Sequence, residues 1–205
     1  MTIADAKIPV SAEEGLRRLM AGNARFIEGT ARFSSLQKDV LAHLAKAQHP
    51  YATIIGCSDS RVPPELIFDA NFGELFVIRV AGNVFSPEIA GSLQYAGIYL
   101  RTPLFVVLGH ENCGAVQAAL DIKFRNSAEA SRIEFLLQDI LPCLDTIDEH
   151  AEPAVRSRLA IEANVRWTMR QIAESPEGRI RTAEGVYKLV GAICEIETGR
   201  VRILE

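Results

Sequence analysis

The sequence has no long hydrophobic run and no excess of positive charge. Its most apolar stretches, such as residues 104–108, are far shorter than the roughly 20 residues of a membrane-spanning helix. The 22 lysines and arginines are outnumbered by 26 aspartates and glutamates, which gives a net charge of -4. Sequence-independent binding of nucleic acid requires a basic surface, so we expect neither nucleic acid nor a membrane as a partner.

Cysteine is also scarce. The 205 residues contain four cysteines: Cys57, Cys113, Cys143 and Cys194. A chain of this length can bury a core without disulfide bonds. Residues 1–10 lack the basic segment and apolar run of a signal peptide. The sequence therefore predicts a cytoplasmic protein whose thiols stay reduced and are free to bind metal or react.

The composition, 48% hydrophobic and 23% charged, is typical of a globular protein. No linker or repeat divides the chain, so we expect one domain over residues 1–205, in which residues 1–50 form an N-terminal helical arm. Ser11 and Glu14 form a capping box before a helical apolar stripe. A second helix is predicted over residues 35–47.

The middle of the chain has the pattern of a parallel sheet. Three short, continuous apolar runs at residues 51–55, 75–80 and 103–108 are typical of strands that are covered on both faces. Helical patterns follow the second and third runs, which indicates an α/β fold with a mostly parallel central sheet and flanking helices. Further predicted elements are helices over 87–100, 114–120, 132–144 and 152–172, and strands over 186–195 and 201–204.

Polar residues follow two of these strands at the point where each strand ends. The first strand leads into Cys57-Ser58-Asp59-Ser60-Arg61, and the third leads into His110-Glu111-Asn112-Cys113. If the two strands are neighbours, then Cys57, His110 and Cys113 converge at the carboxyl edge of the sheet. Two thiolates and one imidazole suit zinc, and three protein ligands leave its fourth position open.

Less specific interpretations exist for the same residues. A single cysteine such as Cys57 is most often a small buried hydrophobe. Asp59 and Arg61 could form an ordinary surface ion pair. Beside a metal, Asp59 could instead be a ligand itself, or Arg61 could hold Asp59 as a hydrogen-bond acceptor for water on the metal.

The segments Cys57-Ser58-Asp59-Ser60-Arg61-Val62-Pro63 and Gly109-His110-x-x-Cys113-Gly114-Ala115-Val116 together resemble a β-class carbonic anhydrase. The stretches 22–26, 73–83 and 92–96 are similar to the same family, so the resemblance extends over nearly the whole chain. It implies one Zn²⁺ per chain bound by Cys57, His110 and Cys113, with Asp59 and Arg61 as the catalytic pair.

The resemblance also implies a substrate pocket for carbon dioxide and bicarbonate. Gln48 and the Gly114 amide match groups that bind the substrate. Phe76, Ala81 and Tyr95 match positions that line the pocket, partly from a second subunit, so a homodimer or homotetramer is implied. Bicarbonate-inhibited members of the family resemble one another in a tryptophan three positions before the first cysteine. This chain has Ile54 there, which favours the unregulated form.

The implied reaction is the reversible hydration of carbon dioxide to bicarbonate and a proton by zinc-bound hydroxide, since zinc lowers the pKa of bound water towards roughly 7. Two alternatives stay open. One is a hydrolase of carbonyl sulfide or carbon disulfide on the same scaffold. The other is a non-catalytic protein with a structural or redox zinc site.

Overall fold

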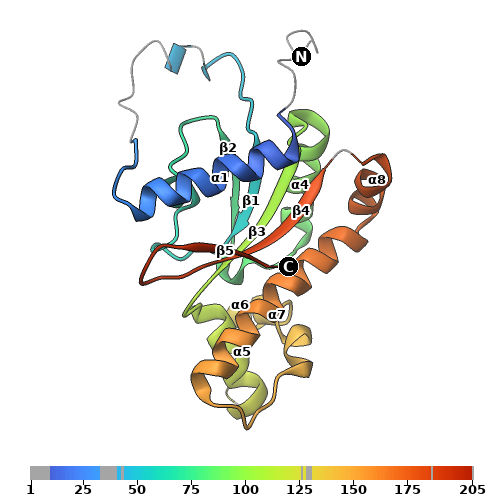
Figure 1. Ribbon diagram of the computed structural model, residues 1–205. Coiled ribbons are helices and arrows are strands. Elements are labelled where there is room, and N and C mark those ends of the chain that lie inside the picture. Colours follow the sequence, from blue (N-terminus) through green and yellow to red (C-terminus); the bar gives the residue numbers. More distant parts are fainter. Residues whose placement is uncertain are drawn as a thin grey trace.

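The computed structural model describes residues 10–32, 41–42, 44–125, 127, 131–185 and 187–204. A five-stranded sheet in the order β2-β1-β3-β4-β5 lies at its centre (Figure 1). Four strands are parallel, and the last is antiparallel to its neighbour. They are β1 (Ala52–Gly56), β2 (Leu75–Arg79), β3 (Leu104–His110), β4 (Lys188–Cys194) and β5 (Val201–Leu204). The α/β prediction and all five predicted strands are confirmed.

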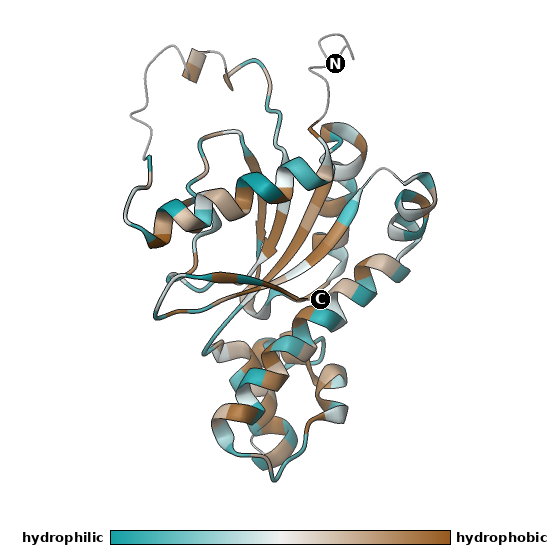
Figure 2. Cartoon of the chain, in the orientation of Figure 1, coloured by the Kyte–Doolittle hydropathy of each residue, from teal (hydrophilic) through white to brown (hydrophobic). Residues whose placement is uncertain are grey.

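The apolar runs form strands in the interior of the sheet because helices cover both of its faces. Every residue of β1 and β3 is buried, whereas β2 at the edge is mostly half-buried. Figure 2 shows the strands as the most continuously hydrophobic part of the chain. Continuous apolar strands of this kind are stable only when both faces are shielded from water.

Helices α1 (Ala12–Ile27) and α7 (Pro153–Glu174) pack on opposite faces of the sheet. A Cβ on Gly15 of α1 would contact the Leu104 side chain, and a Cβ on Gly109 would contact Val165 of α7. Leu104 and Gly109 are an odd number of residues apart on β3, so they face opposite sides. The remaining helical elements are α3 (Pro64–Ile67), η1 (Ala81–Asn83), α4 (Pro87–Tyr95), η2 (Ala96–Leu100), α5 (Gly114–Arg125), α6 (Ser131–Leu137), η3 (Leu141–Thr146) and α8 (Pro176–Glu184).

Helix α1 begins as the capping box predicts. The Ser11 hydroxyl accepts a hydrogen bond from the Glu14 backbone N–H at 3.1 Å. Leu19, which is 1% exposed, anchors the apolar side of the helix in the core of its own chain. The second predicted helix, over 35–47, falls mostly outside the described residues. Of that range, only positions 41, 42 and 44 are described as helical.

One prediction about the C-terminal half is wrong, and one helix there was not predicted. The single helix expected over 132–144 is interrupted: α6 ends at Leu137, and the chain resumes as the 3₁₀ helix η3. Pro142 near the start of η3 has no N–H to donate to a preceding turn, which favours a new element over a continued helix. Helix α8 was not predicted, although Ser175 caps it and Pro176 occupies its first turn. None of the helices described in the structure is both long and apolar enough to cross a bilayer.

The close approach of α7 to the sheet can be tested with two glycines. An alanine Cβ at Gly109 would lie 2.6 Å from Cγ2 of Val165, which is fully buried and cannot move aside. We expect Gly109→Ala to lower the free energy of unfolding by roughly 1–3 kcal/mol. Gly91 lies exposed in α4 with no atom near its missing Cβ, so Gly91→Ala should raise that free energy by roughly 0.5–1 kcal/mol. Urea unfolding measures the free energy of unfolding of both variants. Equal changes in the two variants would contradict the close packing of α7 on Gly109.

Candidate metal centre

The register of the sheet brings the predicted metal ligands together. β1 and β3 are parallel neighbours, with Gly56 opposite Leu108, so their carboxyl ends lie side by side. Cys57 directly follows β1, and His110 is the last residue of β3. Cys113 lies three residues further on, immediately before α5. The donor atoms of Cys57, His110 and Cys113 all lie within 4.8 Å of one another, and all three residues are buried.

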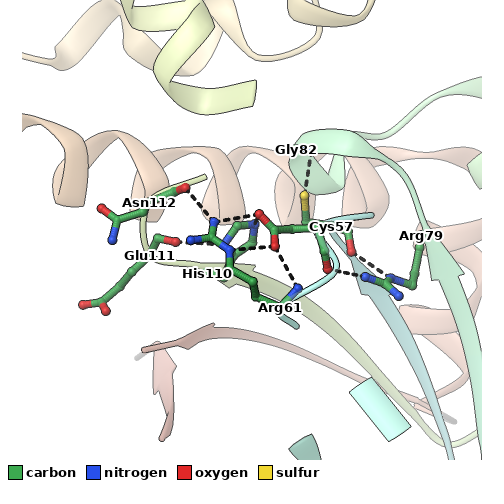
Figure 3. A network of polar contacts seen from close by, with 8 residues as sticks. Cys57, Arg61, Arg79, Gly82, His110, Glu111 and Asn112 are labelled. Atoms are coloured by element: carbon green, nitrogen blue, oxygen red, sulfur yellow. Dashed lines mark hydrogen bonds and ion pairs between the residues drawn. The ribbon is translucent and has the colours of Figure 1, made fainter. Parts of the chain in front are cut away.

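The His110 ring is oriented to offer one nitrogen to a metal. Its Nδ1 lies 2.8 Å from the Glu111 backbone carbonyl oxygen, to which it donates a hydrogen bond (Figure 3). This leaves the lone pair on Nε2, which is buried and has no hydrogen-bond partner among the described residues. A buried polar atom without a partner is costly, and a metal ion at this position would satisfy it.

The two neighbouring sulfurs shift each other's pKa in opposite directions. A hydrogen bond from Cys113 lowers the pKa of the Cys57 thiol to about 4. The adjacent Cys57 sulfur and burial raise the pKa of Cys113 far above its ordinary value. Burial alone would lower the pKa of His110, but its contacts with Cys57 outweigh this effect, so the net shift is upward. A cation beside both sulfurs would stabilise them together as thiolates, and zinc prefers this donor set.

The backbone around Cys57 is held by groups to which the sequence analysis assigned no role. The Gly82 N–H donates to Cys57 Sγ at 3.3 Å. The Arg79 guanidinium donates to the carbonyl oxygens of Cys57 and Asp59, at 2.8 and 2.5 Å (Figure 3). The only signal in the sequence is the Gly82-Asn83 pair after β2, because both residue types tolerate left-handed backbone conformations.

Asp59 and Arg61 form an ion pair at the mouth of the metal centre. Arg61 Nε and an η nitrogen donate to the two carboxylate oxygens at 2.9 and 2.7 Å, and the Arg61 backbone N–H adds a third bond at 2.9 Å. A further η-nitrogen contact reaches the Asn112 carbonyl at 3.2 Å. The Arg61 guanidinium holds the pKa of the Asp59 carboxyl well below its usual range.

The carboxylate is close to the metal ligands without belonging to their cluster. Asp59 Oδ2 lies 3.9 Å from His110 Nε2, and among the residues that the structure describes the cluster of mutually close donor atoms comprises the two cysteines and the histidine. The sequence permitted either metal ligation or pairing with Arg61. This structure contains the pairing with Arg61, so the residues that would hold a metal ion are Cys57, His110 and Cys113.

The other predicted site residues are distributed more widely. Ala81 precedes Gly82 in η1 and is therefore next to the Cys57 contact, and Gly114 is the first residue of α5, directly after Cys113. Gln48 is exposed in the segment before β1.

Phe76 and Tyr95 do not reach the metal centre along the sheet. Phe76 is opposite Thr53 near the start of β1, whereas Gly56, which precedes Cys57, is opposite Arg79. The Phe76 and Tyr95 rings stack at 6.0 Å, and Tyr95 is 41% exposed. The pair therefore lies nearer the start of β1 than the carboxyl edge that carries Cys57.

Comparison with known proteins identifies relatives over almost the full chain. A family model described as carbonic anhydrase matches residues 52–201. Carbonic anhydrase 2 of Mycobacterium tuberculosis (strain ATCC 25618 / H37Rv) is 35% identical over 200 residues, covering 94% of this chain and 91% of that protein. The carbonic anhydrase of Mycolicibacterium smegmatis is 34% identical over 203 residues, covering 95% and 93%.

Solved structures agree with the sequence comparisons. The β-carbonic anhydrase CcaA matches with a TM-score of 0.75 at 30% identity, covering 93% of this chain and 87% of that one. A Coccomyxa β-carbonic anhydrase in complex with acetazolamide matches with a TM-score of 0.74 at 26% identity, covering 92% and 86%.

Proposed function

Because the chain belongs to the β-carbonic anhydrase family, we propose that it catalyses the zinc-dependent, reversible hydration of carbon dioxide to bicarbonate and a proton. The observation that carries this proposal is the convergence of Cys57, His110 and Cys113 beside an aspartate that is already paired with an arginine. A closed structural site would have no use for that ion pair at its mouth.

Cys57, His110 and Cys113 would hold the zinc ion, since they fit its preference for sulfur and nitrogen donors. When bound, zinc supplies the Lewis acidity that makes water nucleophilic near neutral pH. The backbone carbonyl of Glu111 accepts a hydrogen bond from His110 Nδ1–H, which keeps the Nε2 lone pair available to a metal.

In this mechanism, Asp59 orients the attacking water. Its carboxylate is ionised and lies 3.9 Å from His110 Nε2, so it can accept a hydrogen bond from a water molecule beside the metal-binding residues. Arg61 keeps Asp59 in place with two side-chain hydrogen bonds and keeps it charged. A water molecule held in this way would present a lone pair, and not a proton, to carbon dioxide.

Charge develops on the oxygens of carbon dioxide as bicarbonate forms. The Gly114 N–H belongs to the first turn of α5, where helix geometry leaves amide protons free to donate. We assign that amide and the Gln48 side chain to these oxygens. The substrate itself carries no charge, so Ala81 and the Phe76 and Tyr95 rings suit the apolar wall of the pocket.

We further propose that the chain forms a homodimer or homotetramer. β2 is an edge strand, and the Tyr95, Ile98 and Tyr99 side chains near it are 41%, 53% and 67% exposed. An edge strand beside exposed aromatic side chains favours association with another chain. Through such an interface, Phe76 and Tyr95 of one subunit would line the pocket of its partner.

The chain as a whole, residues 1–205, is proposed to act as one domain with residues 1–50 as its N-terminal arm. A cytoplasmic location suits the chemistry, because the four cysteines are free thiols and zinc binding needs them reduced. The acidic net charge gives no support to nucleic acid as a partner.

The proposed reaction is tested by stopped-flow measurement of carbon dioxide hydration, alongside hydrogen sulfide release from carbonyl sulfide and carbon disulfide. We expect hydration that disappears when a chelator removes zinc and returns when zinc is restored. Sulfide release at a higher kcat/KM than hydration would identify a hydrolase of the sulfur analogues. Zinc binding with neither activity would identify a non-catalytic protein.

A further inference from the structure

The 3₁₀ turn η1 presents an amide to the metal centre through an unusual backbone path. Gly82 and Asn83 both have left-handed conformations, with φ of 71° and 45°. This path turns the Gly82 N–H onto Cys57 Sγ at 3.3 Å (Figure 3). Left-handed residues are energetically unfavourable outside glycine, so the surrounding structure must hold this turn in place.

Two side chains of α7 bind the carbonyl groups of the same two residues. Asn164 Nδ2 donates to the Gly82 carbonyl at 2.8 Å, and Thr168 Oγ1 donates to the Asn83 carbonyl at 3.2 Å. Asn164 and Thr168 are one helical turn apart and therefore point in the same direction. Both are almost fully buried, at 1% and 0% exposure.

Helix α7 reaches η1 because the sheet beneath it lacks side chains at two positions. Val165 packs against Gly109 and Gly191, which have no Cβ. A Cβ added to Gly109 would lie only 2.6 Å from Val165 Cγ2. The helix therefore lies close to β3 and β4, and Asn164, the residue beside Val165, extends to the turn. This contact joins parts of the chain that are more than 80 residues apart.

The Asn164 amide is poorly explained by stability alone. Its Oδ1 atom is buried and has no hydrogen-bond partner among the described residues, although its Nδ2 atom is bonded to Gly82. A buried polar atom without a partner costs roughly 1–3 kcal/mol, which an apolar side chain of similar size would avoid. The amide makes one contact that an apolar side chain could not make, the hydrogen bond to the Gly82 carbonyl.

We propose that Asn164 and Thr168 are positioning residues that hold the Gly82 N–H against the Cys57 sulfur and so set how strongly this thiolate donates charge to the metal. The inference rests on the proposed function, because it takes Cys57 as a zinc ligand. An N–H hydrogen bond withdraws charge from a thiolate. When the hydrogen bond is lost, the sulfur donates more charge and leaves the metal ion a weaker Lewis acid.

The test replaces Asn164 with leucine and reads the metal centre directly in the cobalt-substituted protein. The thiolate-to-cobalt charge-transfer band should move to longer wavelength in Asn164→Leu than in the unmodified protein. Turnover of the zinc form should fall by about 10-fold, as is typical when a group that supports a ligand is lost. Thr168→Val removes only a hydroxyl, so it should move the band in the same direction by a smaller amount.

Asn23→Leu is the matched control. Asn23 is also a buried asparagine, 2% exposed, and its amide donates to the carbonyls of Ile67 and Gly199, remote from η1. Its replacement should lower stability and leave the band where it is in the unmodified protein.

The outcomes separate this inference from the proposed function. If the charge-transfer band has the same wavelength in Asn164→Leu as in the unmodified protein, the inference is overturned and the proposed zinc site is unaffected. Absence of any thiolate-to-cobalt band in the unmodified protein overturns both. If Asn164→Leu does not fold, Thr168→Val decides, and an unmoved band in that variant counts against the inference.

Discussion

Replacing either Cys57 or Cys113 with alanine is expected to remove zinc and carbon dioxide hydration together. Each variant leaves one sulfur and one imidazole, and two protein ligands do not retain zinc as three do. Metal content measured per chain should fall from about one zinc ion to close to none. Stopped-flow hydration on the same samples should fall to the uncatalysed rate.

Cys143→Ala supplies the control for these variants. Cys143 is a free, half-buried cysteine in η3 that does not belong to the donor cluster. Its replacement should leave both zinc content and hydration unchanged. Full zinc retention in Cys57→Ala or Cys113→Ala would show that the sulfur in question is not a ligand, provided that circular dichroism shows each variant to be folded.

Asp59→Asn is expected to keep zinc and lose most of the turnover. The amide has nearly the same shape as the carboxylate, but it is neutral, has one acceptor oxygen in place of two and loses the ion pair with Arg61. We expect kcat to fall by about 10²–10³-fold, the range typical of losing one preorganised hydrogen-bonding group at the reacting atoms. Metal analysis and hydration kinetics on the same preparation separate loss of zinc from loss of chemistry.

Asp69→Asn is the matched control, because Asp69 is likewise a carboxylate held by arginines. It is buried, and Arg25 and Arg32 donate to it at 2.5 and 3.2 Å, but it lies outside the metal centre. This variant should lower the free energy of unfolding and leave turnover per folded chain unchanged. Equal turnover in Asp59→Asn and Asp69→Asn would remove Asp59 from the mechanism.

Much of the fold could be predicted from local patterns. Continuous apolar runs predicted β1, β2 and β3, since strands covered on both faces need such runs. The capping box predicted the start of α1 because that signal is confined to a few neighbouring residues. The sequence pattern did not predict the interruption between α6 and η3. The helical spacing of apolar residues continues across it, although the helical conformation of the backbone ends at Leu137.

The types of the candidate metal ligands and their places at strand ends were also available from the sequence. Cys57 and the His110-x-x-Cys113 segment lie where an α/β sheet collects its ligands. Their convergence depended on β1 and β3 being neighbours, and strand order depends on long-range pairing that local patterns do not encode. The choice between metal ligation and ion pairing for Asp59 depended on where the Arg61 side chain lies.

The amino-acid sequence alone was sufficient to predict which donor atoms the candidate site offers, because the type of each residue determines the chemistry of its side chain. The supporting contacts required the tertiary structure. Asn164 and Thr168 belong to a helix more than 80 residues beyond η1, and only the packing of α7 on Gly109 and Gly191 brings them to that turn. Hydrogen bonds between distant segments follow from how helices and strands pack, and no short stretch of sequence specifies that packing.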